Sequence, residues 1–299
     1  MTNALAVLNT GALALSDIEQ AILAEAATDT AAYDPIPTRL TISPGGTNII
    51  MTSDGEALKS LTGIIVISQK ARVYWPEKGG GLPPLCSSPD ALHGFVNAEP
   101  TAAQWAAAGT ARQPHPALPL LDSGAKLPPT FSCASCPLSQ FGSAHQGGAG
   151  RGQACKALRR LVVLADGWAQ PALFTLPPTS LKSFDTYASS LARGRSAYFG
   201  VRTKITLDAQ KSANGDPYSV AAFTTAGALT LEEVAAVLNV RRQFEALVRT
   251  MPIEGVEYDT APVAQTGDPL DLSGNPIPFG DDPFEQGTLI DAPSQRKYT

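Results

Sequence analysis

The chain has 299 residues, of which 43% are hydrophobic and 16% charged, and its formal net charge is −5 at pH 7. These proportions are ordinary for a globular protein that buries a core. No apolar run approaches the roughly 18 residues of a membrane-spanning helix, and no basic stretch like that of a secretory signal begins the chain. We therefore expect a soluble, cytoplasmic protein that does not contact a membrane.

The charge is distributed unevenly. Residues 1–132 carry 7 Lys and Arg against 11 Asp and Glu, residues 133–251 carry 13 against 7, and residues 252–299 carry 2 against 9. A basic middle followed by an acidic end predicts a surface that binds a polyanion and a tail of opposite sign.

The first predicted elements are a helix and three strands. Ser16 and Glu19 form a capping box that begins a helix ending near Ala27. Strands are predicted at residues 39–43, 48–52 and 64–75, and a Pro-Gly-Gly turn joins the first two into a hairpin.

Residues 76 to about 157 are dominated by Gly, Pro, Ser and Ala, with one short helix predicted at Thr101 to Gln104. Regular patterning then returns, and predicts strands and helices up to residue 251: strands at residues 159–165 and 172–176, a helix from Pro177 to about Ala192, a hairpin at residues 198–207 and 218–225, and a helix from Thr230 to before Pro252.

This order predicts an α+β, mainly β fold. A helix between a third and a fourth strand is typical of the oligonucleotide/oligosaccharide-binding (OB) barrel. We expect an OB-like core domain over residues 1–251, with a loop-rich insertion at about 76–157 and flanking helices. Residues 252–299 are rich in Pro, Gly and Asp and lack periodicity, so we expect a disordered acidic tail.

The four cysteines all lie in or at the end of the predicted insertion. The pattern is Cys86, 46 residues, Cys133-x-x-Cys136, 18 residues, Cys155. A C-x-x-C loop presents two thiolates to one metal ion, and two further cysteines complete a tetrahedral, structural Zn²⁺ site. His93 or His145 could replace one cysteine. Alternatively, the cysteines are unrelated buried thiols with a redox pair at Cys133 and Cys136.

Two predicted strands combine cations with an aromatic ring on one face. Alternate residues place Lys70, Arg72 and Tyr74 together on one strand, and Tyr198, Arg202 and Lys204 together on the other. Proteins that bind single-stranded nucleic acid contact phosphates with cations and stack bases on aromatic rings. The six residues predict such a surface, although ordinary solvated strand faces would show a similar pattern.

Four motifs carry a family resemblance: residues 133–137 (CASCP), 141–143 (FGS), 152–156 (GQACK) and 176–182 (LPPTSLK). They resemble a group of uncharacterised phage and mobile-element proteins. The overall plan is similar to that of phage single-stranded-DNA-binding proteins that hold a zinc ion within an OB-fold. This resemblance implies a role in phage or plasmid DNA replication or recombination in a bacterial host cytoplasm.

The tail and the absence of enzyme motifs agree with that expectation. The acidic residues beside Ile277-Pro278-Phe279 look like the acidic tips with which single-stranded-DNA-binding proteins recruit replication partners. Gly147 to Lys156 lacks the Gly-Lys-Ser/Thr of a phosphate-binding loop, and no catalytic triad motif or H-E-x-x-H is present. We predict a non-enzymatic, sequence-tolerant single-stranded-DNA-binding protein. The alternatives are a zinc-stabilised structural or adaptor protein of a virion or replication complex, and a nuclease.

Overall fold

The computed structural model describes residues 37–76, 83–97, 102–110, 114–144, 152–168, 170–212 and 215–257. The chain divides into two compact units, Met1–Ala261 and Pro262–Thr299, and every described residue belongs to the first. The helix predicted at residues 16–27, His145 and the tail beyond residue 257 lie outside the described residues.

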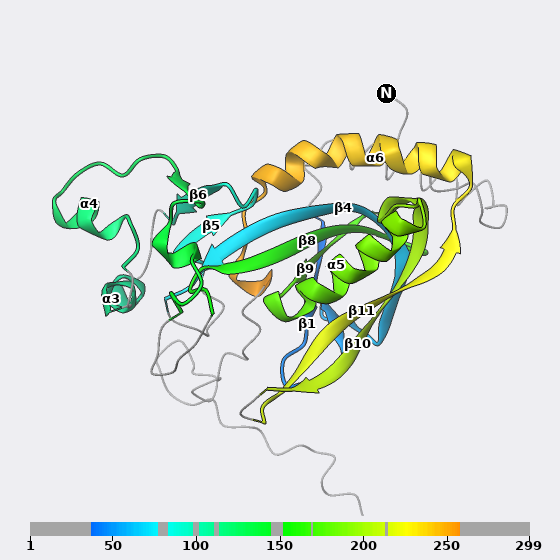
Figure 1. Cartoon of the computed structure of the whole chain (residues 1–299), viewed down its shortest axis with the longest axis horizontal. Coiled ribbons are helices and arrows are strands. Elements are labelled where there is room, and N and C mark those ends of the chain that lie inside the picture. The colour runs from blue at the N-terminus through cyan, green and yellow to red at the C-terminus, as the bar shows by residue number, and fades with distance from the viewer. Residues whose placement is uncertain are drawn as a thin grey trace, which may run out of the picture. The chain divides into compact units, whose positions relative to one another are not determined.

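A sheet of eleven strands forms the centre of the first unit (Figure 1). The strand order is β3-β2-β1-β9-β8-β4-β5-β6-β7, while β10 pairs with β4 and β11 pairs with β10. The strands are β1 (Thr38–Ile42), β2 (Ile50–Thr52), β3 (Ala57–Leu58), β4 (Ser60–Tyr74), β5 (Cys86–Ser88), β6 (His93–Val96), β7 (Phe131–Ser132), β8 (Lys156–Ala165), β9 (Ala172–Leu176), β10 (Val201–Lys211) and β11 (Pro217–Ala228).

The described residues form four α-helices and three 3-10 helices. The α-helices are α3 (Ala102–Thr110), α4 (Leu118–Asp122), α5 (Pro178–Arg193) and α6 (Leu231–Thr250), and the 3-10 helices are η1 (Pro137–Ser139), η2 (Tyr198–Gly200) and η3 (Gly255–Glu257). Within the described ranges, no helix is both long and apolar enough to cross a membrane.

Most of the elements predicted after the insertion are confirmed. Strands β8 and β9 pair antiparallel, and β10 and β11 form the predicted hairpin. Helix α6 begins at the predicted capping box, in which Glu233 N–H donates to Thr230 Oγ1 (3.2 Å) and Thr230 N–H donates to Glu233 Oε2 (2.8 Å). The strand predicted to begin at residue 198 begins instead at Val201, because residues 198–200 form a 3-10 turn.

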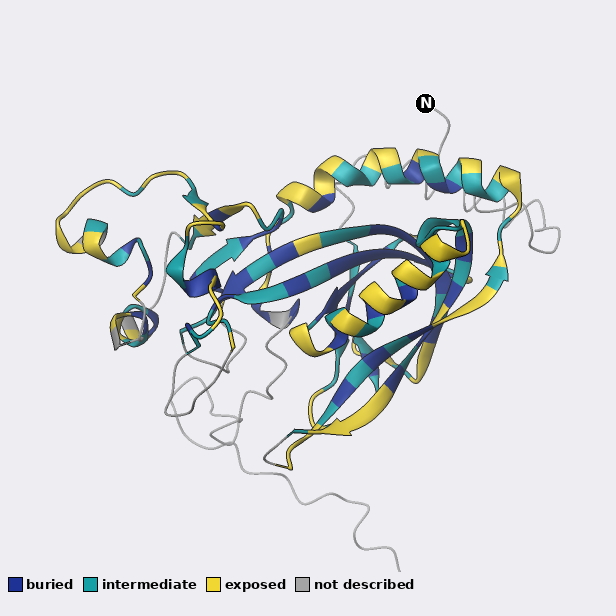
Figure 2. Ribbon diagram, in the orientation of Figure 1, coloured by how far each residue is buried: buried dark blue, intermediate teal, exposed yellow. Residues whose placement is uncertain are grey.

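Two helices cover opposite faces of the sheet, which we call the α5 side and the α6 side. On the α5 side, Phe184 and Tyr187 of α5 pack in a cluster with Ile65 and Phe174. On the α6 side, Val237 of α6 packs in a second cluster of buried residues taken mainly from β4, β8 and β9. Buried residues therefore follow these strands, while the outer sides of α5 and α6 are exposed (Figure 2). The fold is a mixed α+β architecture built on a large, mostly open sheet.

A β-bulge interrupts the alternation of faces along β4. Ile65 lies opposite Val163 and Ile67 opposite Val162, so Val66 is an extra residue in the strand. Ile65 consequently packs on the α5 side, whereas Val66 and Ile67 both pack on the α6 side. The strict alternation expected from the sequence is wrong at this point, and every residue after Val66 changes face relative to that pattern.

The packed part of the chain extends past Met251, where the sequence predicted the tail to begin. Arg160 is fully buried and donates hydrogen bonds to the carbonyl oxygens of Met251 (2.8 Å) and Pro252 (3.1 Å). Its guanidinium also pairs with the buried carboxylate of Glu257 (3.2 Å), which accepts a hydrogen bond from Thr175 Oγ1 (2.8 Å). Residues 251–257 are thus fixed to β8 and β9.

Candidate metal centre and nucleic-acid surface

The insertion between β4 and β8 carries all four cysteines on short structural elements. Cys86 begins β5, Cys133 follows β7, Cys136 caps η1 and Cys155 directly precedes β8. All four are free thiols. Three segments of the insertion therefore contribute sulfurs to the same region of the fold: Cys86, the turn with Cys133 and Cys136, and Cys155.

Side-chain hydrogen bonds fix the turn that carries the C-x-x-C motif. The hydroxyl of Ser139 lies 2.8 Å from the carbonyl oxygens of both Cys133 and Cys136. The backbone N–H of Cys155 donates to the carbonyl of Leu138 (2.9 Å), which connects the turn to the start of β8. A short loop with few apolar residues is thus held in one conformation next to the fourth cysteine.

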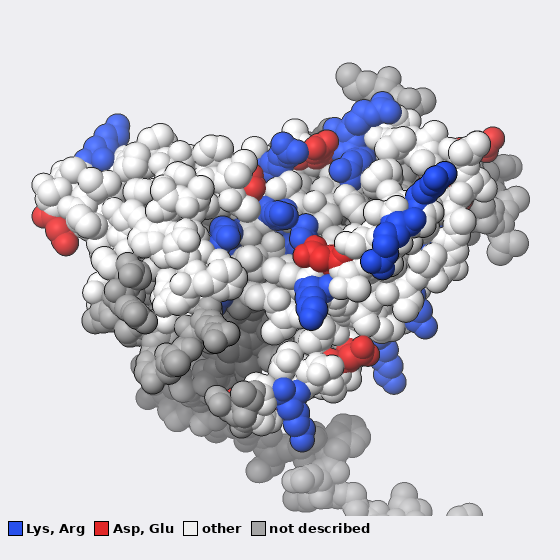
Figure 3. Space-filling model, viewed as in Figure 1, with Lys and Arg blue, Asp and Glu red and all other residues white. Residues whose placement is uncertain are grey.

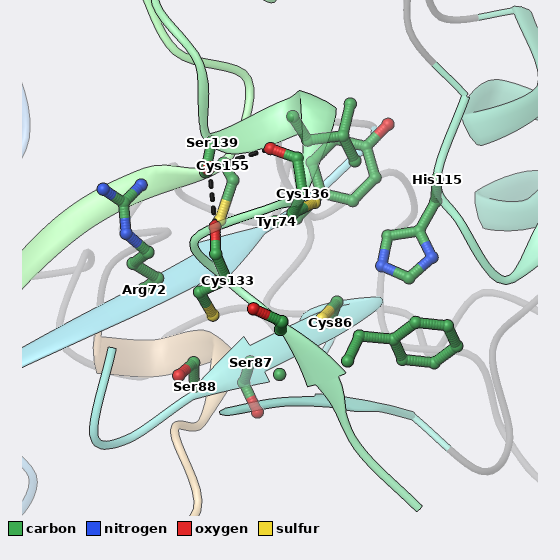
Figure 4. Close-up of a pocket in the computed structure, with 14 residues that line it drawn as sticks. Arg72, Tyr74, Cys86, Ser87, Ser88, His115, Cys133, Cys136, Ser139 and Cys155 are labelled. Carbon is green, nitrogen blue, oxygen red and sulfur yellow. Dashed lines mark hydrogen bonds between the residues drawn. The ribbon is translucent and has the colours of Figure 1, made fainter. Parts of the chain in front are cut away.

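All four cysteines line one small cavity (Figure 4). Its volume is about 20 Å³, enough for one atom the size of a water molecule. Gly94 forms part of its wall, and a Cβ atom at this position would lie 3.0 Å from Cys86 Sγ and 3.8 Å from Cys133 Sγ. A larger residue at position 94 would therefore crowd the sulfur of Cys86.

The cavity favours neutral thiols until a cation enters it. Burial, together with the neighbouring Cys133 and Cys136, raises the pKa of Cys155 to about 12 against the opposing charge of Arg72. Burial, followed by the charges of the other three cysteines, also raises the pKa of Cys86. A bound metal ion reverses this preference because it binds thiolates.

The donor set suits Zn²⁺, which prefers four thiolates in closed structural sites. Among the described residues, no three His, Cys, Asp or Glu side chains form a metal-ligating group as they stand. All four cysteines nevertheless line the same cavity.

Neither of the two described histidines, His93 and His115, completes the ligand set. His93 is exposed and pairs with Asp90 (2.7 Å). His115 lines the cavity, but its Nδ1 accepts the backbone N–H of Ala117 (3.1 Å), so the proton resides on Nε2, the other ring nitrogen. Burial lowers the pKa of His115 to about 4, which keeps the ring neutral. It stacks on Tyr74 and forms a wall of the site (centroid separation 6.0 Å).

The six residues predicted to bind nucleic acid are divided between the two faces of the sheet. Lys70 lies opposite Arg159, which contacts Asp185 of α5 (2.6 Å), so Lys70 lies on the α5 side. Arg202 pairs with Glu233 of α6 (3.4 Å), so Arg202 and Lys204, two residues along the same strand, lie on the α6 side. The structure does not bring the two sets together.

The bulge at Val66 places the two sets of residues on opposite faces of the sheet. Lys204 lies opposite Thr62 of β4, and uninterrupted alternation would put Thr62 on the same face as Lys70. Because Val66 is an extra residue, Thr62 and Lys70 lie on opposite faces instead. The two sets are also separated along β4 by eight residues, or roughly 25 Å at about 3.3 Å per residue.

Several of the six side chains are already engaged within the protein. Tyr74 is only 3% exposed. Tyr198 accepts a hydrogen bond from Arg241 (3.0 Å) and packs on Phe184. Arg202 pairs with Asp166 as well as Glu233. Lys70 and Lys204 are the two of the six that are exposed.

Arg72 lies at the cysteine cavity. It lines the cavity, and its charge opposes the rise in the pKa of Cys155. The sequence indicated neither this placement nor that of His115, because both depend on contacts between distant segments. It did not single out Ser139 either, although the hydroxyl of Ser139 bonds within its own turn. Arg160, which belongs to the basic middle of the sequence, is likewise buried.

No family model, no curated protein and no solved structure matches this chain.

Proposed function

We propose that the chain is a non-enzymatic, sequence-tolerant single-stranded-DNA-binding protein whose cysteine insertion holds a structural zinc ion. The observation that carries this proposal is a group of cations on the α5 side, which we call the basic face: Lys70 of β4, Arg159 of β8, and Lys182 and Arg193 of α5. On the corresponding surface in Figure 3, Lys and Arg side chains recur over these elements with few Asp or Glu.

The basic face has more positive charge than its own carboxylates neutralise. Lys70 and Arg159 are directly opposed on neighbouring strands, where like charges repel. The single acidic residue of α5, Asp185, pairs with Arg159 and leaves Lys182 and Arg193 exposed beside a surface depression along the helix. A phosphodiester backbone would supply the missing negative charge.

The strand order supports the same proposal. Strands β9-β8-β4-β10-β11, with α5 between β9 and β10, follow the strand order of an OB-fold. In that assignment the cysteine insertion occupies the loop between the first two strands, one of the loops with which OB-folds bind oligonucleotides. Because a fold supports many functions, this correspondence is secondary to the charges.

Exposed aromatic side chains favour a single-stranded ligand. Phe141, in the turn after η1, is 82% exposed, and Phe95 of β6 is 47% exposed. Both lie in the insertion, and the hydroxyl of Ser143 fixes the Phe141 turn by contacting the carbonyl oxygens of Leu138 (2.8 Å) and Gln140 (2.6 Å). An exposed ring on a turn whose backbone is fixed is suited to stacking on an unpaired base.

The test compares charge reversal on the two sides of the sheet. We expect Lys70→Glu with Lys182→Glu to weaken binding of the full chain to fluorescent oligo-dT about tenfold or more in moderate salt, with a shallower salt dependence. The matched control is Lys204→Glu with Arg242→Glu, which makes the same change in charge at exposed residues of the α6 side.

The possible results show which side of the sheet binds the nucleic acid. An unchanged affinity in the control, together with a loss in the first variant, supports the basic face as the binding surface. An equal or larger loss in the control assigns the nucleic acid to the α6 side. If the unaltered chain does not bind, the structural or adaptor function remains, with the acidic tail as the segment for a replication or recombination partner.

A further inference from the structure

We propose that Arg72 is a positioning residue of the metal centre, whose guanidinium offsets the negative charge of a zinc tetrathiolate and holds Cys155 by a hydrogen bond. This inference rests on the zinc site of the proposed function and not on its DNA-binding surface. It reassigns a residue that the sequence predicted to contact phosphates.

The position of Arg72 in the sheet directs it to the cavity. Its strand neighbours are Ala157 of β8 on one side and Ser88 of β5 on the other, so it lies where the insertion joins the sheet. The side chain lines the cavity and lies beside Cys133 and Cys155 (Figure 4). Arg72 is partly buried, so less of its side chain is available to a polymer on the outer surface than that of the exposed Lys70.

The hydrogen bonding of Arg72 is incomplete. Its Nη1 atom is buried and has no hydrogen-bond acceptor among the described residues. A buried donor without an acceptor is unfavourable, and a hydrogen bond between charged groups is about twice as strong as a neutral one. The sulfur atoms of Cys133 and Cys155 are the anions that metal binding would create next to this donor.

The charge of a zinc-loaded site is the second reason to assign Arg72 to the metal centre. Zn²⁺ with four thiolates carries a net charge of −2, and a partly buried anion is costly without a cation close by. Among the residues that line the cavity, Arg72 is the one that is always cationic, because His115 is neutral. Groups that hydrogen-bond to metal ligands typically change metal affinity by about 10- to 100-fold.

The experiment measures metal binding directly. The reduced full chain is titrated with Co²⁺, and thiolate-to-cobalt absorption reports the ligand set while competition with a chelator gives the relative affinity for Zn²⁺. We expect Arg72→Met to lower metal affinity about 10- to 100-fold and to alter the cobalt spectrum, and Arg72→Lys to recover part of the loss. Lys70→Met, an exposed position two residues earlier, is the matched control and should bind metal normally.

Two results would overturn the proposal. One is unchanged metal affinity and an unchanged spectrum in Arg72→Met. The other is a zinc-loaded Arg72→Met chain that loses oligo-dT affinity as strongly as the variant with Lys70→Glu and Lys182→Glu, which would return Arg72 to the DNA-binding residues. If Arg72→Met fails to fold, release of Zn²⁺ from Arg72→Lys decides: faster release than from the unaltered chain supports the proposal, and an equal rate contradicts it.

The metal titration needs no DNA ligand, so it distinguishes failure of this inference from failure of the DNA-binding function. An unaltered chain that binds Co²⁺ but not oligo-dT refutes DNA binding alone. An unaltered chain that binds no metal refutes both the zinc site and the role of Arg72.

Discussion

The sheet and the cysteine insertion are stabilised in different ways. Strands β4 and β8 have 15 and 10 residues and are covered on both faces by apolar clusters that include side chains of α5 and α6. In the insertion, β5, β6 and β7 have 3, 4 and 2 residues, and the buried cluster there consists of Tyr74, Leu85, Ala108, Leu138 and Cys155. Burial of apolar surface accounts for the first region, whereas we propose that a zinc cross-link stabilises the second.

Removal of the metal should therefore destabilise the insertion and leave the sheet stable. We expect chelation, or Cys133→Ser with Cys136→Ser, to remove amide-exchange protection from β5, β6 and β7 and to leave the β4–β8–β9 ladder protected. Metal binding contributes about 10–16 kcal/mol in small zinc domains, far more than any single contact in this insertion. Hydrogen exchange followed by mass spectrometry measures both regions in one sample.

The control for this prediction is Cys86→Ser with Cys155→Ser, which removes the other two thiolates. We expect the same pattern from both pairs because the four sulfurs line one cavity. Loss of protection in only one of the two double variants would mean that the cysteines act separately.

Among single substitutions in and around the sheet, Glu257→Ala should cause the largest loss of stability. Its carboxylate is buried and pairs with the fully buried Arg160, so Glu257→Ala leaves a buried guanidinium without its counter-charge. We expect a loss of about 3–5 kcal/mol in the free energy of unfolding, measured by urea denaturation.

Glu245→Ala provides the comparison, since Glu245 forms an exposed ion pair with Arg249 on α6 (2.8 Å). Such pairs contribute about 0–1 kcal/mol. Equal destabilisation by the two substitutions would show that residues 251–257 are not part of the stable core.

The smallest of these effects concerns Phe141, which contributes little to the stability of either region. We expect Phe141→Ala to leave the unfolding free energy unchanged within about 0.5 kcal/mol, because the ring is exposed. Loss of one stacked base should weaken oligo-dT binding about 5- to 150-fold. Leu231→Ala, at a 90% exposed position on α6, should change neither quantity. Normal oligo-dT affinity in Phe141→Ala would exclude this ring as a stacking site.

The sequence predicts the elements well where the pattern is local. The capping box at Thr230, the helix after Pro177 and the hairpin at residues 201–228 all follow from neighbouring residues. The spacing of the cysteines likewise singles out the four residues that share a cavity. In each case the determining residues are close in the chain or belong to a chemically distinctive set.

The faces of the sheet could not be predicted in the same way. One extra residue at Val66 decides whether Lys70 and Lys204 share a surface, and an apolar run from Ile64 to Ile67 gives no sign of where a bulge falls. The pairing of Arg160 with Glu257 joins residues 97 positions apart, so no local pattern reveals it. The sequence pattern therefore identifies the cations but does not distinguish exposed cations from buried ones.

The most direct test of DNA binding is a titration of fluorescent oligo-dT with the full chain and with a chain ending at Ala261, each zinc-loaded and at low and moderate salt. Ending at Ala261 rather than Met251 retains Ile253 and Glu257, which are buried. We predict salt-sensitive binding by both chains, and tighter binding by the shorter one because its acidic competitor is gone. Absence of salt-sensitive binding by both chains would contradict the proposed function.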